Sequence, residues 1–472
     1  MKVILFGTGL MYELYKKCFS FFEVLALADN DTRKQNSFID GIKVIAPEEI
    51  INMDYERVFV LIAMANLSEM QNQLMQIGVK PTDISTVYDI RKYCNEVGKL
   101  KSLTIYTNDF NKIMASTRKR VAIFHPVRGL GINGVDTCLM QLCKILSSIF
   151  EVDVIISQDC NLRGKLLELG ITVIVDEFSH IKRLDDFYWK DNYDMIFLNS
   201  VDMFNVLDGI NNEVSVPIVW WLHTIGEAVL QVPLKRLNTI SHKNINVLAV
   251  SPLTKVAFQH QLPDWKVGEL IYGLDEKATE ITTGKNICNK TIFAIVGRCS
   301  KGKGQDILVN AIKLLPDTIK SKCEIWFVGY MNPNRLFERS LLDKIKSEEC
   351  IKILGALYEG NLEEMYRNID VLVCPSRADA MPIVCAEAMM YYHPCIVSEN
   401  VGTKIFIEDK KSGLICKTGD AADLSSKIQW CVNNSDKLGD MGEKARAIYE
   451  ENFTMEAFER NVLNIVGKLI GK

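Results

Sequence analysis

The sequence predicts an α/β protein of three units, each a mainly parallel sheet covered by helices. Short apolar stretches at 2–6, 120–124 and 292–296 are typical of strands, and each leads through a turn rich in glycine or charge into a helix. Strands that alternate with helices in this way favour parallel sheets. The length of 472 residues suits two to three domains of roughly 150 residues each.

The composition is that of a globular protein without a dominant charge. Hydrophobic residues make up 48% of the chain, and 55 basic side chains stand against 59 acidic ones, for a net charge of −4. We therefore expect no nucleic-acid partner, and the basic run at 118–120 is typical of a solvated linker. No apolar run approaches the roughly 20 residues of a membrane-spanning helix, and the opening apolar run reaches a glycine turn, which indicates a strand and not a signal peptide. Fourteen scattered cysteines without a C-x-x-C pair favour reduced thiols in the cytoplasm over disulfides or structural zinc.

The segment 369–413 holds two acidic residues beside the expected start of a helix, and the predicted chemistry depends on them most. Asp379 lies in a polar turn, and Glu387 lies one to two turns into the helix that follows, with Pro382 suited to its first turn. The backbone amides near Ile383 and the positive end of the helix favour an anion. Two carboxylates beside such a helix start indicate a site for a sugar attached to a phosphate. The expected elements are a strand, a helix and a second strand, at 369–374, 381–390 and 394–398.

A second loop carries cations. The expected strand at 292–296 ends at Gly297, and the loop after it holds Arg298 and Lys303 just before the next helix. An arginine presents a fixed fork of donors and a lysine a point charge, and together they suit a diphosphate.

Two features of the middle of the chain point to the same chemistry. Three glycines, Gly129, Gly131 and Gly134, precede a helix expected at 137–147, so backbone amides can approach a ligand closely. His223 follows an expected strand at its carboxyl end, where it can donate to a sugar hydroxyl or a phosphate oxygen. The other interpretation of the glycine loop is an ordinary turn. The other interpretation of His223 is a histidine whose hydrogen bonds go to the local backbone.

These motifs resemble those of the family-4 retaining glycosyltransferases, which have the GT-B fold. The pattern P-S-x-x-D-x-x-P-x-x-x-x-E-A-M at 375–389 is similar to the E-x7-E signature of that family, and G-R-x-x-x-x-K-G at 297–304 is similar to its diphosphate loop. The resemblance covers about 119–465. Two departures are that the first acid is Asp379 instead of Glu, and that His393 stands where a glycine usually precedes the proline.

The resemblance implies two Rossmann-like GT-B domains that face a cleft, preceded by a small Rossmann-like domain. It implies transfer of a sugar from a nucleoside-diphosphate sugar, with retention, to a glycan or lipid-linked glycan acceptor, without a metal or other cofactor. The expected catalytic residues are Arg298, Lys303, Asp379 and His223. The expected donor-binding residues are Glu387, Gly131, Gly134, Gly297, Met381 and Ile383. The expected ranges are 1–105 for the accessory domain, 119–280 for the acceptor side, 286–450 for the donor side and 451–472 for a helix that crosses back.

The first hundred residues predict a separate β-α-β unit. A strand, a turn at Gly7 and Gly9, a helix expected at 12–22 and a second strand that ends at Asp29 give the Rossmann arrangement without its third glycine. The stretch resembles small Rossmann-like domains at the front of bacterial sugar-modifying proteins. An accessory nucleotide site at Gly7, Gly9 and Asp29 and a docking or oligomerisation domain are both open. Asp31 completes a D-x-D metal pattern with Asp29, but its place after a second strand argues against a metal site.

Three other functions stay open. A non-catalytic partner subunit would explain the departures at Asp379 and His393, a sugar-nucleotide epimerase would act without an acceptor, and an oxidoreductase would require NAD on the first domain. The resemblance to this family and the front domain both favour bacterial surface polysaccharide synthesis. A lipid-linked acceptor would place the protein peripherally at the inner face of the membrane.

Overall fold

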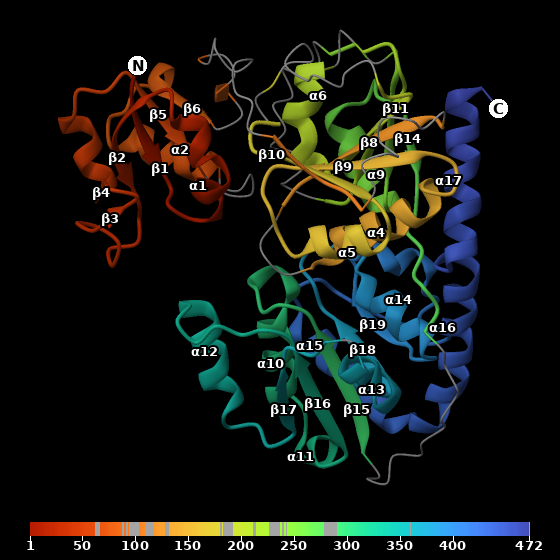
Figure 1. Cartoon of the computed structure of the whole chain (residues 1–472). Coiled ribbons are helices and arrows are strands. Elements are labelled where there is room, and N and C mark those ends of the chain that lie inside the picture. The colour runs from red at the N-terminus through yellow and green to blue at the C-terminus, as the bar shows by residue number, and fades with distance from the viewer. Residues whose placement is uncertain are drawn as a thin grey trace.

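The computed structural model describes the chain over most of its length and contains three separate sheets (Figure 1). The described residues are 1–61, 67–86, 89–90, 93, 103–108, 118–127, 132–179, 182, 192–210, 214–225, 237, 240–241, 243–277, 290–358 and 360–471.

The first sheet lies in the N-terminal unit and has β1 at its centre. Its order is β3 (Phe38–Ile39), β4 (Ile42–Ile45), β2 (Glu23–Ala28), β1 (Lys2–Phe6), β5 (Arg57–Val60) and β6 (Ile84–Thr86). All neighbours pair in parallel except β3 with β4. Its helical elements are α1 (Leu10–Tyr15), η1 (Lys16–Phe19), η2 (Pro47–Asn52), α2 (Leu67–Gln76) and η4 (Pro81–Asp83).

The first helix differs from the single helix predicted at 12–22, because α1 gives way to the 3₁₀ helix η1. Phe19 and Phe22 both pack on Phe59 of β5, at centroid distances of 5.1 and 5.9 Å. The 3₁₀ helix ends at Phe19 and the chain then turns toward β2, so Phe22 reaches the same partner from beyond the helix.

The second sheet has β8 near its centre and winds outward in both directions. Its order is β14 (Val267–Glu269), β13 (Ile245–Ala249), β12 (Ile218–Leu222), β11 (Met195–Asn199), β8 (Arg120–His125), β9 (Glu151–Ile156), β10 (Thr172–Asp176) and β7 (Leu103–Tyr106). Its helices are α4 (Gly134–Leu146), α5 (Leu162–Glu168), η9 (Val201–Met203), α6 (Phe204–Ile210) and α9 (Pro252–Gln261). The edge strand β7 pairs antiparallel with β10, so residues 103–105, which close the predicted range 1–105, lie in the second sheet.

The third sheet is parallel throughout and has β15 near its centre. Its order is β17 (Ile351–Gly355), β16 (Cys323–Val328), β15 (Thr291–Val296), β18 (Val371–Cys374), β19 (Cys395–Ser398) and β20 (Gly413–Cys416). Its helices are η10 (Lys301–Lys303), α10 (Gln305–Lys313), α11 (Asp317–Lys320), α12 (Leu336–Ile345), α13 (Gly360–Asn368), α14 (Ile383–Met390), η11 (Gly402–Phe406), α15 (Ala421–Asn433), η12 (Ser435–Lys437), α16 (Leu438–Asn452) and α17 (Met455–Ile470).

The parallel strands of the second and third sheets share one winding order, in which they run outward on both sides of β8 and of β15. The direction of winding reverses between β8 and β11 in the second sheet and between β15 and β18 in the third. At such a switch point the two following loops diverge, and ligands of doubly wound sheets bind in the gap at the carboxyl ends of the strands.

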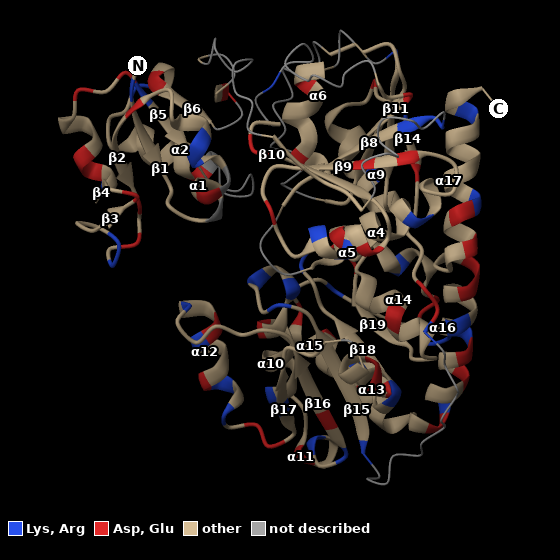
Figure 2. Ribbon diagram, viewed as in Figure 1, with Lys and Arg blue, Asp and Glu red and all other residues tan. Residues whose placement is uncertain are grey.

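One continuous apolar core joins the second sheet, the third sheet and the last helix. Trp221 of β12, Met389 of α14, Phe453 at the end of α16 and Phe458 of α17 all belong to it and are buried. The long helix α17 runs beside both units in Figure 1 and bears acidic and basic residues along its length (Figure 2). Arg446 of α16 pairs with Glu276, which follows the second sheet. The two sheets are therefore held together by packing as well as by charge.

The first unit contacts the second through a turn that follows β10. Phe178 is 5% exposed and packs in the core of the first sheet, and Lys17 pairs with the neighbouring Glu177. Over the residues described, we find no helix with both the length and the apolar character needed to cross a bilayer.

We expect Phe458→Ala to lower the midpoint of thermal unfolding markedly. The ring stacks on Trp221 at a centroid distance of 5.7 Å, and truncation of a buried phenylalanine costs about 3–5 kcal/mol. Leu463→Ala on the same helix is the control, because this side chain is 37% exposed and its loss costs about 0.5 kcal/mol or less. Equal shifts for the two variants in calorimetry would refute the role of α17 as a packed brace.

Candidate functional site

The loops that follow β15 and β18 are packed against each other at the switch point of the third sheet. Gly304 has φ +75°, and a Cβ at this position would lie 2.2 Å from the carbonyl oxygen of Pro375. The backbone N–H of Arg377 donates to Gly302 O at 2.8 Å, and its guanidinium forms two hydrogen bonds with Asp306, at 2.9 and 2.8 Å. Glycine and a bidentate ion pair thus fix the two loops as one surface.

Lys303 and Asp379 meet across this surface. The Lys303 Nζ donates to Asp379 Oδ2 at 2.7 Å, and the two side chains are 40% and 16% exposed. Desolvation acts to lower the pKa of Lys303, but the charge of Asp379 and nearby groups outweighs it, and the pKa is raised. The ammonium therefore stays charged at neutral pH. The backbone of Asp379 is fixed as well, since its N–H donates to Asn400 O and its carbonyl accepts from Gly402 N–H.

Arg298 stands beside this pair in sequence and is exposed. Within the described ranges its guanidinium has no hydrogen-bond or ion-pair partner, although its carbonyl oxygen accepts a hydrogen bond of 3.3 Å from Gln305 Nε2. Gly297 precedes it with φ +137°. The two predicted cations thus differ, because Lys303 is neutralised by the protein and Arg298 is open to solvent.

The start of α14 faces the start of α4 from the other sheet. A Cβ built on Gly134, the first residue of α4, would lie 3.3 Å from Ile383 Cδ1, the first residue of α14. Pro382 is the N-cap of α14 and not part of its first turn as predicted, and its extended ψ of 123° starts the helix two residues later than predicted. Met381 is 6% exposed and packs in the core, so only its backbone can face a ligand.

Glu387 lies deeper in α14 with a buried phenol as its partner. Tyr366 of α13 donates to Glu387 Oε2 at 2.7 Å. Burial raises the pKa of Glu387, and the Tyr366 hydrogen bond offsets part of that rise. His393 supports Tyr366, because its Nε2–H donates to Tyr366 O at 2.6 Å and burial lowers its pKa to about 4. The histidine that departs from the family pattern is therefore a neutral part of the packing beneath Glu387.

His223 lies at the carboxyl edge of the second sheet, directly after β12. Its Nε2 is 2.7 Å from Asn199 Oδ1 at the end of β11, and its ring contacts Trp221 at a centroid distance of 4.3 Å. Asn199 in turn contacts His125, which contacts Asp136. A buried side-chain amide is therefore one partner of His223.

The three residues of the accessory site form a separate group in the first sheet. Gly7 has φ +106°, and a Cβ there would lie 2.5 Å from Leu61 O, whereas a Cβ on Gly9 meets nothing within 4 Å. The Asp29 carboxylate accepts from Thr8 N–H at 3.0 Å and from Lys34 Nζ at 3.1 Å. Partial burial acts to raise the pKa of Asp29, but these hydrogen bonds outweigh it and the pKa is lowered. Its carboxylate is thus engaged within the protein.

Of the predicted site residues, Gly131 lies outside the described residues. Sequence reasoning also missed several residues that contact the predicted ones. The residues not predicted are those that hold the predicted ones: Arg377 and Asp306 beside Lys303, Tyr366 beside Glu387, and Asn199, His125 and Asp136 behind His223. A histidine and an asparagine at the ends of two buried strands were the available signal. In the portion of the chain that is described, no three His, Cys, Asp or Glu residues are grouped to hold a metal.

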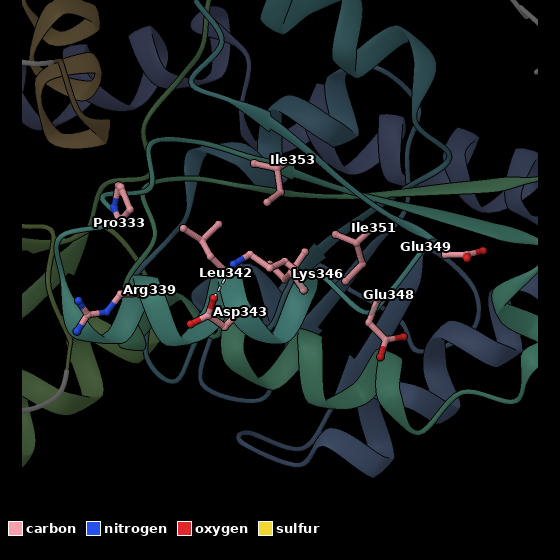
Figure 3. A pocket seen from close by; sticks show the side chains of 10 residues that line it. Pro333, Arg339, Leu342, Asp343, Lys346, Glu348, Glu349, Ile351 and Ile353 are labelled. Carbon is pink, nitrogen blue, oxygen red and sulfur yellow. Dashed lines mark hydrogen bonds and ion pairs between the residues drawn. The ribbon is translucent and has the colours of Figure 1, made fainter.

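An open groove of about 580 Å³ lies apart from these residues, between α12 and β17 (Figure 3). Lys346 and Asp343 pair at 2.8 Å along it, and Ile353 forms part of its apolar lining. None of the predicted site residues lines this groove, which follows one outer edge of the third sheet.

Comparisons with known proteins assign domains and fold. Residues 279–448 match the family model described as Glycosyl transferases group 1, and residues 1–85 match a separate model described as C2185-like, N-terminal. The chain thus carries a Glycosyl transferases group 1 domain behind a C2185-like N-terminal domain. A D-inositol 3-phosphate glycosyltransferase of Corynebacterium kroppenstedtii is 26% identical over 191 residues, which are 39% of this chain and 41% of that protein. The chain therefore matches less than half the length of this curated relative.

Solved structures confirm the predicted α/β architecture with GT-B neighbours. Anabaena HepE in complex with UDP and glucose has a TM-score of 0.62 at 18% identity, covering 75% of this chain and all of that one. The lipopolysaccharide outer core galactosyltransferase WaaB has a TM-score of 0.57 at 15% identity, covering 74% of this chain and all of that one. At these identities the likeness establishes the fold alone.

We expect Gly304→Ala to destabilise the protein more than Gly419→Ala. Both glycines have positive φ, +75° and +81°, so each alanine pays a backbone cost of about 1–2 kcal/mol. Only the Cβ at Gly304 also meets Pro375 O, whereas the one at Gly419 meets nothing within 4 Å. Urea midpoints measure the difference, and a Gly419→Ala loss as large as that of Gly304→Ala would contradict the tight contact between the loops.

We expect the effect of Glu387→Gln on stability to depend on pH. The pKa of Glu387 is raised above 4.5 in the folded protein, so proton binding favours folding below about pH 4.5, and this contribution is lost as the pH rises through the folded pKa. The glutamine keeps the hydrogen bond from Tyr366 but does not titrate. The stability of Glu387→Gln relative to wild type should therefore increase from pH 4.5 to pH 8 in urea unfolding. The exposed Glu364→Gln on α13 controls for the loss of one charge. A Glu387→Gln difference that stays constant with pH would exclude a raised pKa.

Proposed function

We propose that this protein transfers a sugar from a nucleoside-diphosphate sugar to a glycan or lipid-linked glycan acceptor, with retention of configuration. The observation that carries the proposal is the Lys303–Asp379 pair at the switch point of the third sheet, next to the exposed Arg298 and the start of α14. Cations and helix amides at the carboxyl edge of a sheet suit a diphosphate, and a neighbouring carboxylate suits the sugar attached to it. The Glycosyl transferases group 1 domain and the UDP bound by HepE support the proposal.

In this proposal Arg298 and Lys303 hold the diphosphate and offset the charge that develops on it as the glycosyl bond breaks. Asp379 orients the sugar ring, Glu387 accepts hydrogen bonds from the ribose hydroxyls, and His223 contacts the sugar or phosphate. The bond from the anomeric carbon to the β-phosphate breaks, and the bond to the acceptor oxygen forms on the same face. The acceptor proton passes to the leaving phosphate oxygen, so no protein base is assigned.

The acceptor side of the proposal is bacterial surface polysaccharide synthesis. WaaB, whose name gives it a lipopolysaccharide substrate, shares the fold. For the N-terminal C2185-like domain the proposal keeps two roles open, docking or oligomerisation and an accessory nucleotide site. With a lipid-linked acceptor the protein would work at the inner face of the membrane. The accessory groups Gly7, Gly9 and Asp29 are not part of the proposed donor site.

We expect Lys303→Ala to weaken nucleoside-diphosphate binding by about tenfold to a hundredfold, since a hydrogen bond to a charged group contributes about 1.5–3 kcal/mol. Calorimetric titration with UDP, GDP, ADP and dTDP names the base that wild type prefers. Lys301→Ala, an exposed cation of the same 3₁₀ helix, is the matched control and should bind like wild type. The double variant Lys303→Ala, Asp379→Ala separates the lost cation from the unpaired carboxylate.

Equal binding by wild type and Lys303→Ala would refute the donor site. The anomeric configuration of the product, read by NMR from the matching nucleotide sugar, tests retention separately. Binding without turnover of any sugar donor would favour a non-catalytic partner subunit.

A further inference from the structure

Four polar side chains form a hydrogen-bonded chain across the carboxyl edge of the second sheet. Asp136 Oδ1 is 2.8 Å from His125 Nε2, His125 Nδ1 is 2.9 Å from Asn199 Nδ2, and Asn199 Oδ1 is 2.7 Å from His223 Nε2. His125 and Asn199 end β8 and β11, the two strands between which the winding reverses, and Asp136 lies in the first turn of α4. Asp136, His125 and Asn199 are 5%, 1% and 0% exposed.

The donor and acceptor roles along these four side chains follow from the carboxylate of Asp136 at one end. An ionised carboxylate only accepts hydrogen bonds, and the second oxygen of Asp136 accepts from Asn133 N–H at 2.8 Å. His125 therefore carries a proton on Nε2. The atom that faces Nδ1 is Asn199 Nδ2, an amide nitrogen that only donates, so Nδ1 accepts and the ring is neutral. Asn199 must then turn its amide nitrogen toward His125 and its oxygen toward His223. An oxygen at that place requires a proton on Nε2 of His223.

We propose that Asp136 sets the tautomer of His223 through His125 and Asn199, so that His223 carries its proton on Nε2. Asp136, His125 and Asn199 are positioning residues, and the part that rests on the proposed function is that His223 touches the donor. Burial of Asp136, His125 and Asn199 makes the arrangement strict, because a reversed amide would turn its oxygen to the accepting Nδ1 of His125 and leave two acceptors facing each other in the interior. The tautomer of a histidine decides which ring atom accepts and which donates toward a ligand.

The variant Asp136→Asn tests the chain without removing its shape. Its oxygen can still accept from Asn133 N–H, but its nitrogen now donates to His125 Nε2. His125 must then carry its proton on Nδ1, Asn199 must reverse, and His223 must move its proton to Nδ1. We expect ¹⁵N–¹H correlation NMR of histidine-labelled protein, which has six histidines, to show His223 change from the Nε2–H to the Nδ1–H form. His223→Gln assigns the signal.

The double variant Asp136→Asn, Asn199→Asp is the sharper test. A carboxylate at 199 accepts from both neighbours, so His223 should return to the Nε2–H form although two residues of the chain are changed. Asp420→Asn, at the N-cap of the distant helix α15, controls for altered helix capping and should leave His223 as in wild type. If His223 is unchanged in Asp136→Asn, or is Nδ1–H in wild type, the proposal is overturned.

Turnover gives a second readout. If His223 touches the donor, Asp136→Asn should lower kcat by about tenfold to a hundredfold, taking as a guide the loss when outer partners of metal-bound histidines are removed, and the double variant should recover most of it. A tautomer change without any glycosyl transfer by wild type would sustain the hydrogen-bonded chain and reject the proposed function. If Asp136→Asn changes the tautomer of His223 but leaves glycosyl transfer unaffected, the tautomer of His223 has no role at the donor.

Discussion

The reversal of winding in a doubly wound sheet leaves a gap above two neighbouring strands, because the loops that leave them run in opposite directions. In the third sheet that gap receives Lys303 from the loop after β15 and Asp379 from the loop after β18. In the second sheet it receives His125 from β8 and Asn199 from β11. The polar groups of the candidate site therefore do not depend on a specialised loop fold. They depend on where parallel strands of both sheets end.

The two groups obey different electrostatic rules. Lys303 and Asp379 are partly exposed and neutralise each other, so a bound anion competes with a carboxylate for one cation. The chain behind His223 is buried, and its members satisfy one another through donors and acceptors of fixed direction. A partly exposed pair tolerates rearrangement because water can replace a lost partner. A buried chain does not, because each unpaired group would pay its full desolvation cost.

Contact between the two sheets brings these groups into one region. Gly134 meets Ile383 at the starts of α4 and α14, and the shared core extends from Trp221 to Phe458 of the last helix. The glycine matters here because a larger side chain would meet Ile383 before the helices could approach so closely. Packing of α17 on both units thus bears on the site as well as on stability.

The sequence by itself determined the α/β class and the place of most strands, because apolar runs that alternate with helices leave few ways to bury a parallel sheet. The GT-B architecture was predicted from the resemblance of its motifs to a known family. The sequence also located the loops that carry Arg298, Lys303, Asp379 and Glu387, since charged residues after buried strands must lie at the carboxyl edge. Their roles stay predictions. Two local features were not predicted. The helix expected at 12–22 changes from α1 to η1 at Lys16, and β7 depends on an edge of the second sheet that the local pattern does not reveal.

Only the tertiary structure decided which groups touch. Tyr366 reaches Glu387 across 21 positions, Arg377 reaches Asp306 across 71, and Asn199 joins His125 to His223 across 74 and 24. Such pairings follow from strand order and register, which bring distant residues to one edge, and no local pattern in the sequence records them. Propensity and apolar periodicity act over a few residues. The partners that fix a charge, a phenol or a tautomer are chosen by the sheet as a whole.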